Sequence, residues 1–160
     1  MVNINIIVDN EAFRPEFANV GDAGADIRAN LNISPTRVFG ESACVRGRTL
    51  TIAPNSRVLI DCGFAMAIPK GYEAQIRPRS GKSIKEGAHI PNSVGTIDSG
   101  YRGKVMVAIH NMNSIDLHVE HCERIAQMLI KKCEDTSYTI VETLDETERG
   151  ATGFGDSGKH

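Results

Sequence analysis

The sequence predicts an all-β fold, and two observations carry this prediction. Short segments of alternating apolar and polar residues recur along the chain, as at 3–8 and 57–68. Clusters of Gly, Pro, Asn and Asp separate these segments, as at 53–56 and 111–116, and such clusters are turn signals. Many short strands with regular turns are typical of a sandwich or a barrel.

Each expected element follows from its local pattern. The segments that alternate as strands are 3–8, 49–53, 57–68, 72–76, 104–110 and 139–142, and Ile125, Met128 and Ile130 mark a further core strand within 123–130. The one plausible helix, 80–87, is only about two turns long. Residues 34–48 are expected to form an extended loop or hairpin whose role the sequence does not reveal.

Composition limits the classes of function. A chain of 160 residues with 41% hydrophobic and 24% charged residues is expected to form one globular domain. The net charge of −2 argues against binding along a nucleic-acid backbone, so a polyanionic ligand would depend on a few well-placed Arg and Lys residues. No apolar run reaches the roughly 18–20 residues that span a bilayer, and a cytoplasmic or nuclear location is expected.

The cysteines and the C-terminal residues give two further expectations. Cys44, Cys62, Cys122 and Cys133 show no C-x-x-C spacing, which favours free thiols over a zinc site or a disulfide framework. Residues 145–160 are rich in glycine and lack periodicity, so we expect a mobile arm after a folded domain at 1–144.

Five motifs carry the functional information: A-G-A-D-I-R-A at 23–29, P-R-S-G at 78–81, N-S-V-G-T-I-D-S-G-Y-R-G-K-V-M-V at 92–107, E-R-I-A-Q-M-L-I at 123–130 and R-G-A-T-G-F-G-D-S-G at 149–158. Together and in this order they resemble the trimeric dUTP pyrophosphatases (dUTPases). The resemblance implies a distorted jelly-roll β-barrel with one short helix and a flexible C-terminal arm. It also implies a homotrimer with shared active sites and hydrolysis of dUTP to dUMP and pyrophosphate. If the source is viral, the expected location is the host cytoplasm.

Asp98 is the candidate catalytic residue. Hydrolysis between the α and β phosphates needs a water held in line with the phosphorus and a carboxylate that accepts its proton. The resemblance gives this role to the Asp of I-D-x-x-Y-R-G, which is Asp98. The alternative is that Asp98 only caps the turn before Ser99 and Gly100, a common use of aspartate.

The second motif invites comparison with a phosphate-binding P-loop. S-G-K-S at 80–83 matches the end of that loop, but G-x-x-x-x-G-K-S requires glycine at position 76, where this chain has Ile76. The resemblance instead has Arg79, Ser80 and Gly81 hold the triphosphate. Lys82 replaces the leucine usual in the family and is expected to make the site slightly more basic.

The resemblance assigns the remaining contacts one by one. Tyr101 would pack under the deoxyribose and reject ribonucleotides, and the hairpin backbone would read the uracil edge. Asp26 would order the phosphate region through the arginine of the second motif. The other substrate-binding residues would be Asn92, Gly95, Thr96, Ile97, Met106, Gln127, Arg149, Phe154, Gly155 and Ser157.

Mg²⁺ is the implied cofactor. It prefers oxygen ligands and binds largely through substrate phosphates and water, so no direct protein ligand is expected. The histidines are scattered without metal-ligand spacing. Two rivals stay open: a dCTP deaminase or bifunctional deaminase–dUTPase, and a regulator that binds a partner protein through residues 34–48 with nucleotide as its signal.

Overall fold

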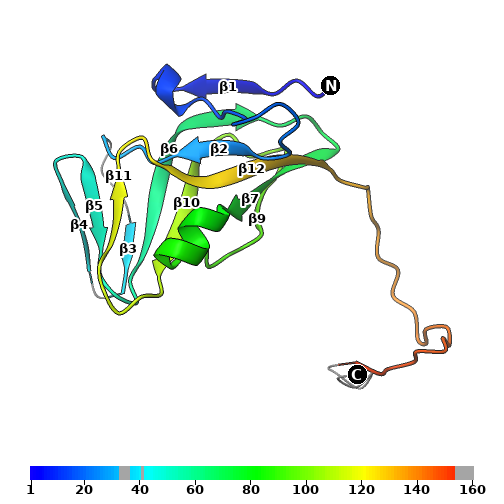
Figure 1. The fold of residues 1–160 in the computed structure, drawn as a ribbon. Helices are drawn as coiled ribbons and strands as arrows, with labels where there is room; N and C mark the ends of the chain where they lie inside the picture. Colours follow the sequence, from blue (N-terminus) through cyan, green and yellow to red (C-terminus); the bar gives the residue numbers. More distant parts are fainter. Residues whose placement is uncertain (33–36, 41, 154–160) are drawn as a thin grey trace.

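Three antiparallel sheets build the molecule, a computed structural model that describes residues 1–32, 37–40 and 42–153 (Figure 1). The largest sheet has the order β1 (Asn5–Val8), β6 (Arg57–Ala67), β10 (Lys104–Asn111) and β8 (Ala88–His89), with β3 (Arg37–Phe39) also pairing β6. The second sheet has the order β2 (Ala25–Arg28), β12 (Arg124–Lys132), β7 (Tyr72–Pro78) and β9 (Gly95–Ile97). The third orders β11 (Leu117–Glu120), β5 (Thr49–Ile52) and β4 (Ala43–Arg46). The predicted all-β class is confirmed.

Alternation along the long strands produces the core. In β10 every second residue is buried, from Val105 through Val107 and Ile109 to Asn111. Side chains of opposite strands meet on one face because the strand period is two. The largest fully buried side chains come from all three sheets, and they include Phe64 of β6, Ile27 of β2 and Leu50 of β5. The sheets therefore enclose one common core.

The expected helix is present as η2 (Gly81–Lys85), a short helix with π-type hydrogen bonding. It lies directly after β7, and Ser83 N donates to Arg79 O across the junction (2.9 Å). A second short helical segment, the 3₁₀ turn η1 (Glu11–Phe13), was not predicted. Its N-cap is Asn10, whose side chain accepts from Ala12 N (2.9 Å).

Three sequence expectations need correction or refinement. Residues 139–142 form no strand, because no neighbouring strand is present to pair with their backbone groups. Residues 25–28, expected only as a motif, form strand β2. The described part of 34–48 forms β3 and β4, and β4 makes a hairpin with β5 through Gly47 at φ 61°.

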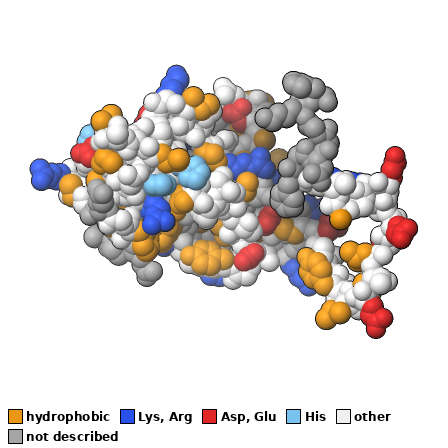
Figure 2. All heavy atoms as spheres, turned by 90° about the horizontal axis from the view of Figure 1, so that it is seen from below, with side chains coloured by type: hydrophobic (Ala, Val, Ile, Leu, Met, Phe, Trp, Pro, Cys, Tyr) orange, Lys and Arg blue, Asp and Glu red, His pale blue; other side chains and the backbone are white. Residues whose placement is uncertain are grey.

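The chain leaves the body of the molecule after β12. Cys133 N still donates to Gly71 O (2.9 Å), and residues 134–153 then run outward without strand or helix (Figure 1). Figure 2 shows acidic and apolar side chains along this projecting segment. Tyr138, Ile140 and Leu144 are among the exposed apolar residues, with Ile140 fully exposed. We call residues 134–153 the C-terminal segment.

All four cysteines are free thiols, as predicted. Cys62 is fully buried in β6, and burial followed by the charge of Asp61 raises its pKa far above the ordinary value. A thiol that stays protonated is a poor nucleophile, so Cys62 acts as a core residue. No helix in the described part of the chain is long and apolar enough to cross a membrane.

Candidate active site

A polar cavity of about 420 Å³ lies where β7 meets η2 and faces β2 and β12. It gathers four residues predicted to act at the phosphates, Arg79, Ser80, Gly81 and Gln127, together with Asp26. The other lining residues are Ala18, Asp22, Ala23, Gly24, Arg77 and Leu129. We call it the phosphate cavity.

Asp26 holds two arginines at the wall of this cavity. Its Oδ1 accepts from Arg79 Nε (2.7 Å) and its Oδ2 accepts from Arg124 Nη1 (3.1 Å). Arg79 Nη1 also donates to the backbone oxygen of Arg124 (3.3 Å). The carboxylate is buried on β2, so both arginines are fixed in position by charge-assisted hydrogen bonds. The expected contact between Asp26 and Arg79 is present, and Arg124 is a participant that the sequence reasoning missed.

Gln127 is oriented by its surroundings. Its Nε2 donates to Pro78 O (2.9 Å), which leaves its side-chain oxygen toward Gly24. A Cβ atom at position 24 would meet that oxygen at 2.5 Å, so a larger residue there would displace the end of the Gln127 side chain. This explains one of the small residues in A-G-A-D-I-R-A.

Lys82 does not make the cavity more basic, contrary to the sequence expectation. Its side chain is buried, and its Nζ contacts Glu86 (2.6 Å) and also Glu123. Two carboxylates therefore neutralise it. Lys82 lies in η2 and Glu123 directly precedes β12, so their ion pair links this helix to the start of that strand.

A second cavity of about 230 Å³ lies at the connection between β9 and β10. In this structure β9 pairs with β7, and β10 pairs with β6 and β8, so the predicted hairpin is a connection between two sheets and not a pair of bonded strands. It is lined by Thr96, Ile97, Asp98, Tyr101 and Met106 of the predicted site, together with Leu59, Lys104 and Val105. Asp98 is exposed at the end of β9, and Tyr101 N donates to Asp98 O (3.1 Å) to close the turn. The backbone oxygen of Asp98 thus takes part in the turn, while its carboxylate is exposed at the cavity. We call it the hairpin cavity.

Tyr101 and Asn92 owe their positions to neighbouring glycines. Tyr101 OH donates to Lys104 O (2.9 Å), and its ring passes so close to Gly103 that any Cβ there would overlap it. The Asn92 amide lies beside the buried Gly95, where an added Cβ would be 3.3 Å from Asn92 Nδ2. Asn92 and Gly95 therefore adjoin the hairpin without lining its cavity.

A second carboxylate, that of Glu73, lies next to Asp98 at this end of the sheet. The register pairs Ala74 with Ile97, so Asp98 lies one position further on, next to Glu73. Partial burial, then the carboxylates of Glu73 and Asp98, raise the pKa of the neighbouring Cys133 thiol. Cys133 is therefore a protonated neighbour of Asp98 rather than a competing nucleophile.

The two cavities share no lining residue. Asp98 lies beside the first residues of β7, whereas Arg79 follows its last residue, Pro78. The six residue-to-residue steps of extended chain from Glu73 to Arg79 span roughly 20 Å. One chain therefore keeps the predicted base and the predicted phosphate ligands at opposite ends of β7.

Of the residues predicted from the fifth motif, Arg149 is described, and it lines neither cavity. Arg149 is exposed on the C-terminal segment, where its Nε donates to Thr152 O (3.2 Å). Phe154, Gly155 and Ser157 lie outside the described residues. Within the described ranges no group of three His, Cys, Asp or Glu side chains could hold a metal ion.

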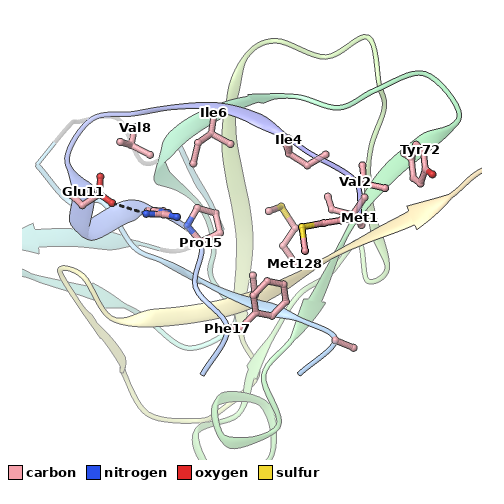
Figure 3. A pocket seen from close by; sticks show the side chains of 14 residues that line it. Met1, Val2, Ile4, Ile6, Val8, Glu11, Pro15, Phe17, Tyr72 and Met128 are labelled. Atoms are coloured by element: carbon pink, nitrogen blue, oxygen red, sulfur yellow. Dashed lines mark hydrogen bonds and ion pairs between the residues drawn. The ribbon is translucent and has the colours of Figure 1, made fainter. Parts of the chain in front are cut away.

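A third cavity, of about 870 Å³, is a separate apolar groove beneath β1 (Figure 3). Ile4, Ile6 and Val8 line one side of it, and Phe17 and Met128 line the other. None of the predicted site residues that the structure describes lines this apolar groove.

The fold and the site together indicate an all-β protein that acts on a phosphate-bearing ligand. Arginines line one cavity, and an exposed carboxylate lies at the other. Comparison with known proteins identifies the family. The dUTPase family model matches residues 44–158. The deoxyuridine 5'-triphosphate nucleotidohydrolase of Roseobacter denitrificans is 42% identical over 144 residues, which cover 90% of this chain and 86% of the relative.

Two further comparisons cover nearly the whole chain. The deoxyuridine 5'-triphosphate nucleotidohydrolase of Fusobacterium nucleatum is 38% identical over 158 residues, 99% of this chain and 98% of the relative. A solved structure of a Staphylococcus bacteriophage 80alpha dUTPase variant with dUpNHpp superposes with a TM-score of 0.78 at 25% identity, covering 98% of each chain. The chain belongs to the dUTPase family, and it is a dUTP diphosphatase.

Proposed function

We propose that the enzyme cleaves dUTP to dUMP and pyrophosphate through in-line attack of a water on the α phosphorus, with Asp98 as the base. In this mechanism the water's oxygen forms the new bond to phosphorus while the bond to the bridging oxygen breaks. Its proton passes to the Asp98 carboxylate, and the electron pair leaves with pyrophosphate. The observation that carries this proposal is the Asp98 side chain at the hairpin cavity, beside residues that fit a nucleoside.

Substrate selection follows from the hairpin. Tyr101 is held against Gly103 by its hydrogen bond to Lys104 O, so its ring forms a fixed wall of the cavity. A fixed ring under the sugar would leave no space for a 2′-hydroxyl. Thr96 and Ile97 supply backbone polar groups at the same cavity, and with Asn92, Gly95 and Met106 they form the proposed uracil and sugar contacts.

The separation of the two cavities supports an active site shared between subunits of a homotrimer. A base must lie within hydrogen-bonding reach of the water that attacks the α phosphate, while Arg79, Ser80, Gly81 and Gln127 would bind the same triphosphate. One chain holds these groups roughly 20 Å apart along β7. A closed ring of subunits can bring the hairpin of one chain to the phosphate cavity of the next.

Exposed apolar surface also supports association. The apolar groove beneath β1 is open, and the C-terminal segment carries Tyr138, Ile140 and Leu144 in exposed positions. Monomeric proteins rarely leave continuous apolar surface of this kind uncovered. The arm beyond residue 145 would then close Arg149, Phe154, Gly155 and Ser157 over the substrate.

Mg²⁺ is the proposed cofactor, and the scarcity of free oxygen ligands in the phosphate cavity fits an ion that is bound mainly through the substrate. Arginine nitrogens dominate the cavity, and Asp26 is occupied by Arg79 and Arg124, which leaves Asp22 as the carboxylate without an arginine partner among the described lining residues. A Mg²⁺ ion would therefore take most of its oxygen ligands from the phosphates and water. When bound, it neutralises charge on the triphosphate.

In the cell, we propose that the reaction limits uracil incorporation into DNA and supplies dUMP for thymidylate synthesis. Pyrophosphate release measured with dUTP, dTTP, dCTP and UTP tests the activity. Rapid release from dUTP alone, lost on chelation of Mg²⁺, is expected. Comparable turnover of UTP would refute the role of Tyr101, and ammonia release from dCTP would favour the deaminase alternative.

A further inference from the structure

Arg77 is the cation of the phosphate cavity without a carboxylate partner. Asp26 forms ion pairs with Arg79 (2.7 Å) and Arg124 (3.1 Å). Among the described residues no ion pair involves Arg77, which also lines the cavity. Since Asp26 offsets part of the charge of Arg79, Arg77 is the arginine lining this cavity whose charge no described carboxylate offsets.

The guanidinium of Arg77 also has an unused donor. Its Nη2 donates to Gln75 Oε1 (2.6 Å), but its Nε is buried and has no hydrogen-bond partner, the one such side-chain atom in the part of the chain that the structure describes. A buried N–H group without an acceptor costs free energy, and native proteins retain few of them. Such a group at a cavity wall is expected to gain an acceptor when a ligand binds.

Strand register places Arg77 where a phosphate ligand can reach it. Arg77 of β7 lies opposite Gln127 of β12, and opposite residues of antiparallel strands present their side chains on the same face. Gln127 lines the same cavity and is fixed by its bond to Pro78 O (2.9 Å). Arg77, Gln127 and Arg79 therefore surround one polar space.

We propose that Arg77 is a further substrate-binding residue that donates from its guanidinium to the β or γ phosphate of dUTP. This inference rests on the proposed function, because it takes a triphosphate as the ligand. Asp98 must lie next to the α phosphate, and Arg77 lies in the other cavity, so it binds the pyrophosphate that leaves. The planar fork of arginine suits adjacent phosphate oxygens.

Affinities of two ligands test this assignment. The ligands are an α,β-imido analogue of dUTP, which resists hydrolysis, and dUMP, which lacks the β and γ phosphates. The measured quantity is the affinity for the imido analogue divided by the affinity for dUMP, both obtained by calorimetry with Mg²⁺ present. Arg77→Gln should lower this ratio about 10- to 100-fold, the range for a hydrogen bond to a charged group. Arg77→Lys keeps the charge but loses the fork, and should give an intermediate ratio.

Arg57→Gln is the matched control, because Arg57 is exposed on β6 and lines neither cavity. Its ratio should equal that of the wild type. An unchanged ratio in Arg77→Gln, or equal weakening of both ligands, would overturn the assignment. If the wild-type protein itself bound the imido analogue no better than dUMP, the proposed function would fail instead, so the two failures are distinguishable.

A measurement on the unaltered protein covers the case in which Arg77→Gln does not fold. The Nε–Hε signal of Arg77 is assigned in an ¹H–¹⁵N spectrum by its loss in Arg77→Lys. Addition of magnesium pyrophosphate should shift this signal and slow its exchange with water, because the Hε gains a phosphate acceptor. A signal that stays in place at saturating pyrophosphate contradicts the proposal.

Discussion

At the scale of single residues, Asp26 and Asp98 show how burial separates the tasks of two carboxylates. Asp26 is buried and bonded to Arg79 and Arg124, so its oxygens are engaged within the protein. Asp98 is exposed at the hairpin cavity, and the turn uses its backbone oxygen while its side chain stays available. This division supports Asp98 as the base and Asp26 as a residue that positions Arg79.

Asp98→Asn separates chemistry from binding. The amide keeps the size of the carboxylate but cannot accept a proton from water, so kcat for dUTP should fall about 10²- to 10⁴-fold. The affinity for the α,β-imido analogue should change little, since other residues would hold the base, sugar and phosphates. Pyrophosphate release and calorimetric titration measure the two quantities. Equal losses in both would assign Asp98 to the turn alone.

His121 gives the fold a dependence on pH. Its Nδ1 accepts from Leu31 N (3.0 Å), and its ring meets the edge of Phe13 at 5.5 Å between centroids. Burial, then the charge of Arg48, lowers the pKa of His121 below its ordinary value of 6.5. The folded protein then binds fewer protons than the unfolded chain, so this contribution to stability is complete above pH 6.5 and declines as pH falls below it.

His121→Asn should weaken this dependence, because the asparagine oxygen can accept from Leu31 N without titrating. Urea denaturation of the wild type and the variant at several pH values between 5 and 8 measures it. The wild type should lose more stability than the variant on the acid side. Parallel curves for the two proteins would show that His121 does not titrate on unfolding.

At the scale of elements, ion pairs of Lys82 hold η2 to the sheet. Lys82 is buried between Glu86 and Glu123, and Glu123 Oε2 also accepts from Glu120 N (2.8 Å). Arg79, Ser80 and Gly81 lie directly before or at the start of this helix. The ion pairs therefore fix the helix that follows the predicted phosphate ligands.

Lys82→Met should destabilise the protein by about 1–3 kcal/mol, because it leaves Glu123 partly buried without its cation. This range is below that for a fully buried pair, since both carboxylates are partly exposed. The double variant Lys82→Leu with Glu123→Leu removes both charges and should recover part of the loss. Urea denaturation measures both variants, and a double variant less stable than Lys82→Met would contradict this account.

The C-terminal segment is the second element with a testable role. Its residues contact the body little after Cys133, and the bonds of Arg149 with Thr152 close a local turn. A chain that ends at Glu148 should keep its melting temperature while its kcat for dUTP falls steeply, since closure over a substrate positions groups and excludes water. Thermal unfolding and pyrophosphate release test this. Unchanged kcat would show that residues 149–160 take no part in turnover.

The sequence predicts local elements well and partners poorly. Alternation identifies β6 and β10 because one face of each strand packs into the core while the other face is more exposed. It predicts a strand at 139–142 that the single chain does not form, since the pattern of a strand says nothing about which backbone will pair with it. Motifs locate Arg79 and Asp98, whereas Arg77 and Lys82 require three-dimensional neighbours before their roles appear.

At the scale of the whole molecule, assembly with other copies of the chain would explain three features. These are the separation of the phosphate cavity from the hairpin cavity, the open apolar groove, and the exposed apolar residues on the C-terminal segment. Each is incomplete in one chain, and each is expected to be completed by another copy. The central claim is that the Asp98 of one subunit acts on a triphosphate held by Arg79 of its neighbour. A shared site makes function inseparable from assembly.

Mixing two inactive proteins tests this claim most directly. Asp98→Asn and Arg79→Gln, each carrying a different affinity tag, are co-expressed, and trimers with both tags are isolated and confirmed by native mass spectrometry. If a site takes Asp98 from one subunit and Arg79 from the next, every trimer that carries both tags has one site of three with two intact residues, so roughly a third of wild-type kcat should return. Mixed trimers that stay as inactive as either parent would contradict the shared site, because a site built within one chain would carry a defect in every subunit.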